Sequence, residues 1–240
     1  MILSISDHIA RIRLNRPAEH NRIEPDDLDT LASHLESVNA NHAIRVLIVE
    51  STGKTFSSGF HLGAIGSDSP QRFEQIADAL AWTRVPTIAA LQGSIYGGAA
   101  DLALACDFRI GVPHLELMVP AVKLGIPYYP SAVERFLTRL TPRAVKRILI
   151  LCEKLKSSEL LECGYLDEVV VPEQLQSRVG ALAEQLASLA PFAVEALKAQ
   201  LNRFDRAAAN EAVRRCLASQ DHQEGLTAWL EKRTANFKRA

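Results

Sequence analysis

The sequence predicts an α/β protein in which a core of alternating strands and helices is followed by a helical C-terminal part. Strand and helix patterns alternate up to Pro127, and from there to Lys238 the pattern is helical almost throughout. Alternation of this kind favours a parallel sheet whose strands are joined by helices. We therefore expect a core over residues 1–180 and a helical region over residues 181–240.

The strands of this core are predicted from their period and their apolar content. Residues 9–14 alternate apolar and basic side chains and stop before Pro17, which predicts a strand at or near the edge of a sheet. Residues 45–51 and 87–93 read RVLIVES and TIAALQG, apolar runs of the length typical of buried strands. A further strand is expected in DFRIGV, from Asp107. We expect these strands to run parallel.

Helices are predicted where apolar residues recur at helical spacing after a capping residue or a proline. The longest amphipathic pattern follows Pro25, and a second contains Phe73, where Ser69 and Pro70 supply the cap. Glu134 and Arg135 are expected on the solvent-exposed face of a later helix. The expected helix starts are Pro25, Ser69, Gly97, Thr141, Ser157 and Pro172.

Composition excludes several classes of function. The 240 residues contain 27 basic and 28 acidic side chains, so no basic surface for nucleic acid or for an anionic membrane is expected. No apolar run reaches the ~20 residues of a membrane span, and the first residues lack a signal-peptide pattern, which predicts a cytoplasmic protein. The four cysteines are scattered without ligand spacing, so we expect neither disulfides nor a metal site.

Two glycine-containing turns are candidates for binding an anion. Gly97 and Gly98 end a strand and begin a helix, where free backbone N–H groups lie at the positive end of the helix dipole. The turn in KTFSSGFHLG, residues 54–63, follows the preceding strand and exposes the N–H of Phe60. Neither turn has the spacing of a dinucleotide or P-loop motif. Two such donors that converge would form an oxyanion hole.

With these two turns in this order, the chain resembles the enoyl-CoA hydratase/isomerase family, the crotonase superfamily. The resemblance runs from LNRPAEHN at Leu14, through TFSSGFHL and QGSIYGGAADLALACDFRI, to EGLTAWLEKRTANFK. It implies a crotonase-like (ββα)n superhelical spiral core, a helical C-terminal trimerisation region and a homotrimer or a dimer of trimers. It also implies that the N–H groups of Phe60 and Gly98 hold the thioester oxygen of an acyl-CoA as an enolate forms. Coenzyme A then enters as part of the substrate, with no other cofactor.

The resemblance further implies where coenzyme A binds. Trp229 and Lys232, in the last helix, match places from which family members reach the coenzyme A of a neighbouring subunit. Interface or core packing is the alternative role for Trp229, and a hydrogen bond within the loop is the alternative for His61. The lysine often found at the place of Ala18 is missing. The implied channel residues are Ala18, Glu19, His20, Ser58, His61 and Leu62.

Asp101 is the acid expected to handle a proton or a water. It follows Gly98 by three residues, so both lie on one face of the helix. By resemblance it aligns with one of the two glutamates of the hydratases, whereas the place of the second is held by Ala121. General acid–base help is worth ~10²–10⁴-fold per group, so a site with one carboxylate is a handicapped hydratase. The alternative is a buried carboxylate held by helix N–H groups or by a tyrosine.

Tyr128 and Tyr129 stand where hydratases usually have a glycine-rich turn, and a tyrosine at this place resembles the methylmalonyl-CoA decarboxylase branch. Decarboxylation needs the oxyanion hole more than it needs a base. Hydration is the first expectation, decarboxylation the second, and double-bond isomerisation stays close behind. A catalytically inert CoA-binding protein is the alternative outside this class. Side chains expected to narrow the acyl pocket are Phe60, Ile65, Tyr128 and Tyr129.

Overall fold

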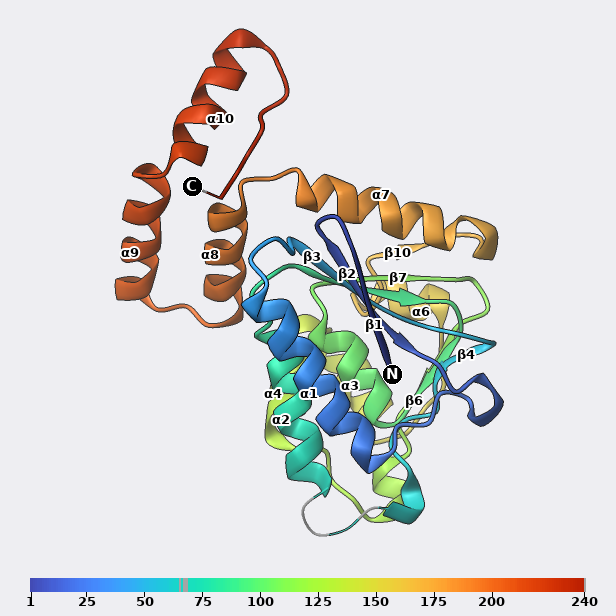
Figure 1. The fold of residues 1–240 in the computed structure, drawn as a ribbon. Helices are drawn as coiled ribbons and strands as arrows, with labels where there is room; N and C mark the ends of the chain where they lie inside the picture. Colours follow the sequence, from blue (N-terminus) through green and yellow to red (C-terminus); the bar gives the residue numbers. More distant parts are fainter. Residues whose placement is uncertain (65, 67–68, 240) are drawn as a thin grey trace.

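Two sheets form the framework of the core (Figure 1). The computed structural model describes residues 1–64, 66 and 69–239, and Ile65 therefore lies outside the described residues. The larger sheet has the strand order β1 (Ile2–Ser6), β2 (Ile9–Leu14), β3 (Val46–Ser51), β5 (Thr87–Leu91), β7 (Phe108–Gly111) and β10 (Glu168–Val169). The smaller sheet has the order β4 (Thr55–Ser57), β6 (Ser94–Tyr96), β8 (Glu116–Met118) and β9 (Leu155–Lys156).

Helices follow the strands in a regular order. The helices are α1 (Pro25–Ala40), α2 (Ser69–Ala81), α3 (Gly98–Ala105), α4 (Pro130–Arg139), α5 (Pro142–Leu149), α6 (Ser157–Glu162), α7 (Leu175–Ala187), α8 (Pro191–Asn202), α9 (Arg206–Leu217) and α10 (Gln220–Glu231). Three times in succession, the chain adds a strand to the larger sheet, a strand to the smaller sheet and then a helix. Within each sheet, the strands of successive turns pair in parallel. This topology confirms the predicted (ββα)n spiral.

The N-terminal strand prediction needs one addition. β2 was expected at or near a sheet edge, and it is the second strand from the edge, because β1 pairs with it antiparallel on the outer side while β3 pairs with it in parallel on the inner side. Ser6 faces Ile9 across the hairpin, so the turn consists of Asp7 and His8 alone. Asp7 has a left-handed φ of 52°, as short hairpin turns require. The alternation in residues 9–14 was read correctly, and the short strand before it was missed.

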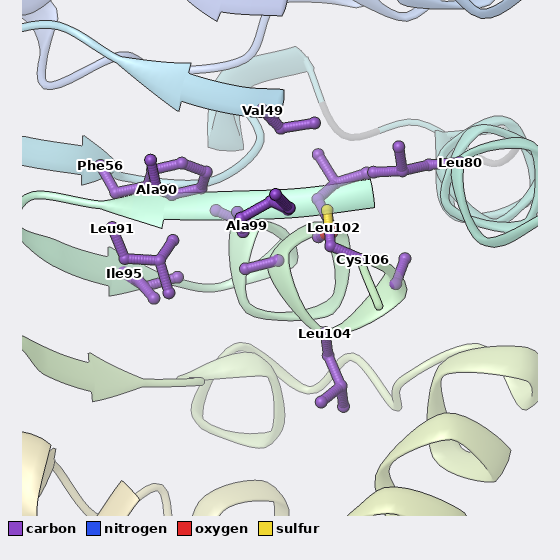
Figure 2. Close-up of a cluster of buried hydrophobic side chains, with 14 of the residues drawn as sticks. Val49, Phe56, Leu80, Ala90, Leu91, Ile95, Ala99, Leu102, Leu104 and Cys106 are labelled. Carbon is purple, nitrogen blue, oxygen red and sulfur yellow. The ribbon is translucent and has the colours of Figure 1, made fainter. Parts of the chain in front are cut away.

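The apolar core surrounds α3. Figure 2 shows Val49 and Ala90 of the larger sheet, Ile95 of the smaller sheet, and Ala99 and Leu102 of α3 in one cluster of buried apolar side chains. α3 also contacts α2 and α4, and every residue from Ala99 to Ala105 is buried. Small side chains let the neighbouring elements approach this helix from all sides. Any polar side chain on α3 therefore needs a partner inside the protein.

The C-terminal helices divide into two groups. α7 packs on β3, β5 and β7 of the larger sheet, whereas α8, α9 and α10 extend away from it (Figure 1). Lys198 of α8 is tied to the core, because its Nζ donates to the Val85 carbonyl at 2.8 Å and pairs with Asp107 at 2.7 Å. A division of the chain at residue 180, which lies within α7, remains a proposal. In the described part of the chain, no helix combines the length and apolarity needed to span a membrane.

Two glycines give opposite predictions for stability. A Cβ on Gly93, in the turn between β5 and β6, would lie 2.0 Å from the Lys54 carbonyl oxygen, so Gly93→Ala should lower the free energy of unfolding by about 1–3 kcal/mol. Gly180, inside α7, has open space around its Cα, so Gly180→Ala should raise it by about 0.5–1 kcal/mol. Urea denaturation of both variants measures these changes. Equal effects of the two substitutions would contradict the described packing of β6 against β4.

Candidate active site

The smaller sheet brings three segments of the chain to one place. β4, β6 and β8 are parallel neighbours, so their carboxyl ends lie at one edge of the sheet. Residues 58–60 leave β4 at this edge, Gly97 and Gly98 leave β6, and Pro120 and Ala121 leave β8. Ligands commonly bind beyond the carboxyl ends of parallel strands. The pairing of three short strands thus positions the parts of the site.

The two backbone donors predicted for an oxyanion hole lie on adjoining turns. Ile23 donates its N–H to the Gly59 carbonyl at 2.9 Å and accepts from the His61 N–H at 2.9 Å. These bonds hold both sides of Phe60 and leave its own N–H unused. Gly59 has φ 86°, and a Cβ on it would lie 3.3 Å from the Gly98 nitrogen. Within the described residues, no acceptor is bonded to the N–H of Phe60 or of Gly98.

A mostly apolar cleft of about 170 Å³ opens beside these donors. Its polar side chains are those of serines and tyrosines, and none of the described lining residues carries a charge. A concave apolar site with a few polar groups is the usual form of a small-molecule site. The described lining residues are Ser58, Phe60, Leu62, Ser69, Pro70, Phe73, Tyr96, Gly97, Gly98, Pro120, Ala121, Leu124, Ile126, Pro127, Tyr128 and Tyr129.

One wall of the cleft is a row of aromatic rings. The rings of Tyr128 and Tyr129 stack with centroids 5.5 Å apart and an interplanar angle of 5°. Phe73 lies 6.1 Å from Tyr129 and 5.9 Å from Phe60 in an edge-on arrangement. Phe73 also explains the glycine at position 98, because a Cβ there would lie 2.7 Å from its ring. The sequence placed Phe73 in a helix core but gave no sign that it would line the site.

Both tyrosine hydroxyls of this wall are hydrogen-bonded to the protein. The hydroxyl of Tyr128 donates to the Gly97 carbonyl at 2.7 Å, and that of Tyr129 donates to Asp101 Oδ2 at 2.6 Å. Burial, reinforced by the charge of Asp101, raises the pKa of each phenol well above its usual value. The two phenols therefore stay protonated at neutral pH and act as hydrogen-bond donors rather than as bases.

Asp101 lies behind this wall. Its side chain is fully buried, and Arg135 donates to it from Nε at 2.9 Å and from Nη2 at 2.6 Å. These donors and Tyr129 form the arrangement that the sequence analysis gave as the alternative role of Asp101, a buried carboxylate held by a tyrosine. Asp101 is not among the described residues that line the cleft. It can reach a bound molecule only if the ring of Tyr129 moves aside.

Arg135 corrects a prediction. It was expected on an exposed helix face, but only 9% of the residue is exposed, and it points inward from α4. Besides Asp101 it bonds Asp78 of α2 at 2.5 Å. Burial by itself would lower the pKa of Arg135, but the hydrogen bonds with Asp101 and Asp78 outweigh it and raise that pKa. An arginine 34 residues away from its aspartate leaves no local sequence signal.

The residues implied for coenzyme A fall in two places. Ala18 and Glu19 belong to a short 3₁₀ helix, Pro17–Glu19, and the His20 carbonyl accepts from the Ser58 N–H at 2.9 Å, beside the donor turn. His61 Nδ1 donates to Glu24 Oε2 at 2.8 Å. Of the six channel residues, the cleft includes Ser58 and Leu62.

Trp229 and Lys232 lie elsewhere. Trp229 is 84% exposed on α10, and Lys232 caps the end of that helix. In Figure 1, α10 lies at the opposite end of the molecule from β4 and β6, the strands that lead into the cleft. The described residues contain no cluster of three or more His, Cys, Asp or Glu side chains suited to a metal ion.

The Asp101–Arg135 pair gives a prediction for stability. Arg135→Met leaves Asp101 buried and without its charged partner, so the free energy of unfolding should fall by about 3–5 kcal/mol. The matched control is Arg178→Met, which breaks a partly exposed pair with Glu168 and should cost about 1 kcal/mol or less. Chemical denaturation of both variants tests this. A loss at Arg135 as small as that at Arg178 would contradict the buried pair.

Comparisons with known proteins agree with this fold. The family model described as enoyl-CoA hydratase/isomerase matches residues 4–240. The chain is 31% identical to crotonyl-CoA hydratase of Syntrophomonas wolfei, over 99% of this chain and 97% of that protein. It is 31% identical to carnitinyl-CoA dehydratase of Salmonella arizonae, over 96% and 95%. A crystal structure of enoyl-CoA hydratase from Bacillus anthracis superimposes with a TM-score of 0.93 at 25% identity, covering 100% of this chain and 99% of that one. The chain therefore belongs to the enoyl-CoA hydratase/isomerase family.

Proposed function

We propose that this chain is an acyl-CoA enzyme of the hydratase/isomerase type that holds the thioester oxygen between the N–H groups of Phe60 and Gly98. The observation that carries the proposal is this pair of unused donors at the edge of an apolar cleft. Negative charge grows on the thioester oxygen as an enolate forms. Fixed donors stabilise that charge most strongly where water is excluded. Coenzyme A enters as part of the substrate, and this chemistry needs no further cofactor.

Coenzyme A is proposed to run along Ala18, Glu19 and His20 toward the donor turn. The hydrogen bond from Ser58 to the His20 carbonyl supports this path, because it places the two segments side by side. Trp229 and Lys232 are proposed to reach the coenzyme A of a neighbouring subunit in a homotrimer or a dimer of trimers. Apolar side chains exposed on and between α8, α9 and α10 support self-association: Leu201, Phe204, Leu217, Trp229 and Leu230.

Hydration of an enoyl thioester is the reaction suggested by the names of the relatives. The water oxygen bonds to the β-carbon, the electron pair of the double bond moves into the thioester as an enolate, and a proton is then delivered to the α-carbon. One group must accept a proton from water and one must supply the proton for carbon. Asp101 is the group that we propose for these proton transfers, and it can act only if Tyr129 moves. Isomerisation of the double bond, with Asp101 as a single proton shuttle, requires the same movement of Tyr129.

Decarboxylation is the second candidate, and a specific observation favours it. The engaged Asp101 and the methyl group of Ala121 leave the described cleft wall without a free carboxylate. In decarboxylation the bond between the α-carbon and the substrate carboxylate breaks, and its electron pair becomes the enolate. Carbon dioxide leaves and water supplies a proton to the α-carbon. The apolar wall with Tyr128 and Tyr129 disfavours the charged carboxylate of the ground state.

The oxyanion hole can be tested by removing one N–H. Gly98 is the first residue of α3, a position that tolerates proline, so Gly98→Pro removes the donor while keeping the helix. Gly98→Ala is the matched control, because it introduces the same Cβ beside Phe73 and keeps the N–H. We expect turnover of the active substrate to be about 10²–10³-fold lower with proline than with alanine. Equal rates in the two variants would rule out Gly98 as an oxyanion donor.

The two reactions can be separated with two substrates. The second candidate, decarboxylation, predicts that carbon dioxide is released from methylmalonyl-CoA faster than crotonyl-CoA is hydrated, because with Asp101 engaged by Tyr129 and Arg135 hydration lacks acid–base help worth ~10²–10⁴-fold per group. Loss of the conjugated thioester absorbance measures hydration, and trapped carbon dioxide measures decarboxylation. Faster hydration would overturn the second candidate. Tight binding without turnover of these two substrates or of a 3-enoyl-CoA, the substrate for isomerisation, would identify an inert CoA-binding protein and overturn the enzyme proposal.

A further inference from the structure

Arg135 is connected to the cleft through one intermediate. Its guanidinium grips both oxygens of Asp101, and Asp101 Oδ2 in turn accepts the hydroxyl of Tyr129. A bidentate arginine fixes the orientation of a carboxylate as well as its position. Arg135 is itself held from α2 by Asp78 and from its own helix by Ser131 Oγ at 3.3 Å. Arg135, Asp101 and Tyr129 therefore form a clamp that joins α3 and α4 to the cleft wall, and Asp78 ties this clamp to α2.

Tyr129 is the member of this clamp that faces the substrate. It lines the cleft, whereas Asp101 does not. Its ring is stacked on Tyr128, whose hydroxyl is bonded to Gly97, and Phe73 lies on another side. Asp101 lies one helical turn beyond Gly98, so the ring bonded to it stands one turn along α3 from the proposed site of the thioester oxygen.

The volume of the cleft limits the size of the acyl group that can bind beside this wall. An apolar cavity of about 150 Å³ is known to hold a benzene molecule, which has six carbon atoms. The cleft here measures about 170 Å³. Because the same cleft also contains the proposed thioester site, it admits an acyl group of roughly four to six carbon atoms, the thioester carbon included, when the wall stays in place.

We propose that Arg135 is a positioning residue that fixes the ring of Tyr129, through Asp101, as the wall that restricts this enzyme to short acyl groups. This inference rests on the proposed function, because it requires an acyl-CoA in the cleft. It assigns Asp101 a role in selecting the substrate. It also gives a reason for the buried Asp101 in α3, a helix that otherwise consists of glycine, alanine and leucine.

Calorimetric titration with CoA, butyryl-CoA and octanoyl-CoA tests the proposal without any turnover, since saturated thioesters are not hydrated. We expect the wild type to bind butyryl-CoA about ten-fold or more tightly than octanoyl-CoA, because each methylene that does not fit is worth about that factor. Tyr129→Ala should remove or reverse this preference by opening the wall. Tyr129→Phe keeps the ring and loses only the bond to Asp101, so the preference should fall without being reversed.

The clamp itself is tested by removing its charges together. The double variant Asp101→Leu with Arg135→Met leaves no buried charge unpaired, and we expect its preference for butyryl-CoA to fall several-fold. Glu168→Leu with Arg178→Met is the matched control, because it removes an ion pair outside the cleft and should leave the preference unchanged. Circular dichroism confirms that each variant is folded, and loss of stability alone would not change a ratio of two affinities.

The outcomes separate this inference from the function on which it rests. Equal binding of both acyl-CoA thioesters by the wild type would overturn the inference and leave the proposed function standing. An unchanged preference in Tyr129→Phe and in the Asp101–Arg135 double variant would likewise show that Arg135 does not position the wall. If neither thioester binds more tightly than CoA alone, the acyl site itself is wrong, and the proposed function falls together with the inference.

Discussion

The parallel pairing of β4, β6 and β8 is the constraint on which the rest of the site depends. Each of these strands has only three residues, and each runs directly into a segment that borders the cleft. Their common register brings the N–H groups of Phe60 and Gly98 together with the chain at Ala121. The approach of Gly93 to the Lys54 carbonyl belongs to the same pairing. The spiral of the larger sheet matters to function mainly because it places these three short strands side by side.

Burial determines what Asp101 can do. An acid inside an apolar helix must be satisfied by partners, and here Arg135 and Tyr129 provide three hydrogen bonds. The same bonds separate the carboxylate from the cleft and hold a phenol ring in its place. The sequence suggests proton transfer for Asp101, whereas in the folded protein its carboxylate lies behind the cleft wall and holds Tyr129. The partners that decide this role come from α4 and its N-cap and not from α3, the helix that carries Asp101.

Family membership and reaction are separate questions for this chain. The fold is that of the enoyl-CoA hydratase/isomerase family, and the two donor turns are proposed to stabilise an enolate. Which bond is made or broken depends on the acids and bases that surround the α- and β-carbons. One fold supports several reactions by changing such side chains. Ala121 and the engaged Asp101 are the places where, by the resemblance described above, we expect this chain to differ from a hydratase with two carboxylates.

The sequence by itself determined the long elements and located the two donor turns. Apolar runs identified β3 and β5, helical periodicity identified α1 and α2, and glycines beside strand ends located Phe60 and Gly98. Only the tertiary structure decided the short strands and the partners of Asp101. Three residues are too few for a period, and Asp101 meets Arg135 across 34 residues only because α3 packs against α4. Local patterns report what neighbours in the chain share, whereas the chemistry of this cleft depends on side chains that folding alone brings together.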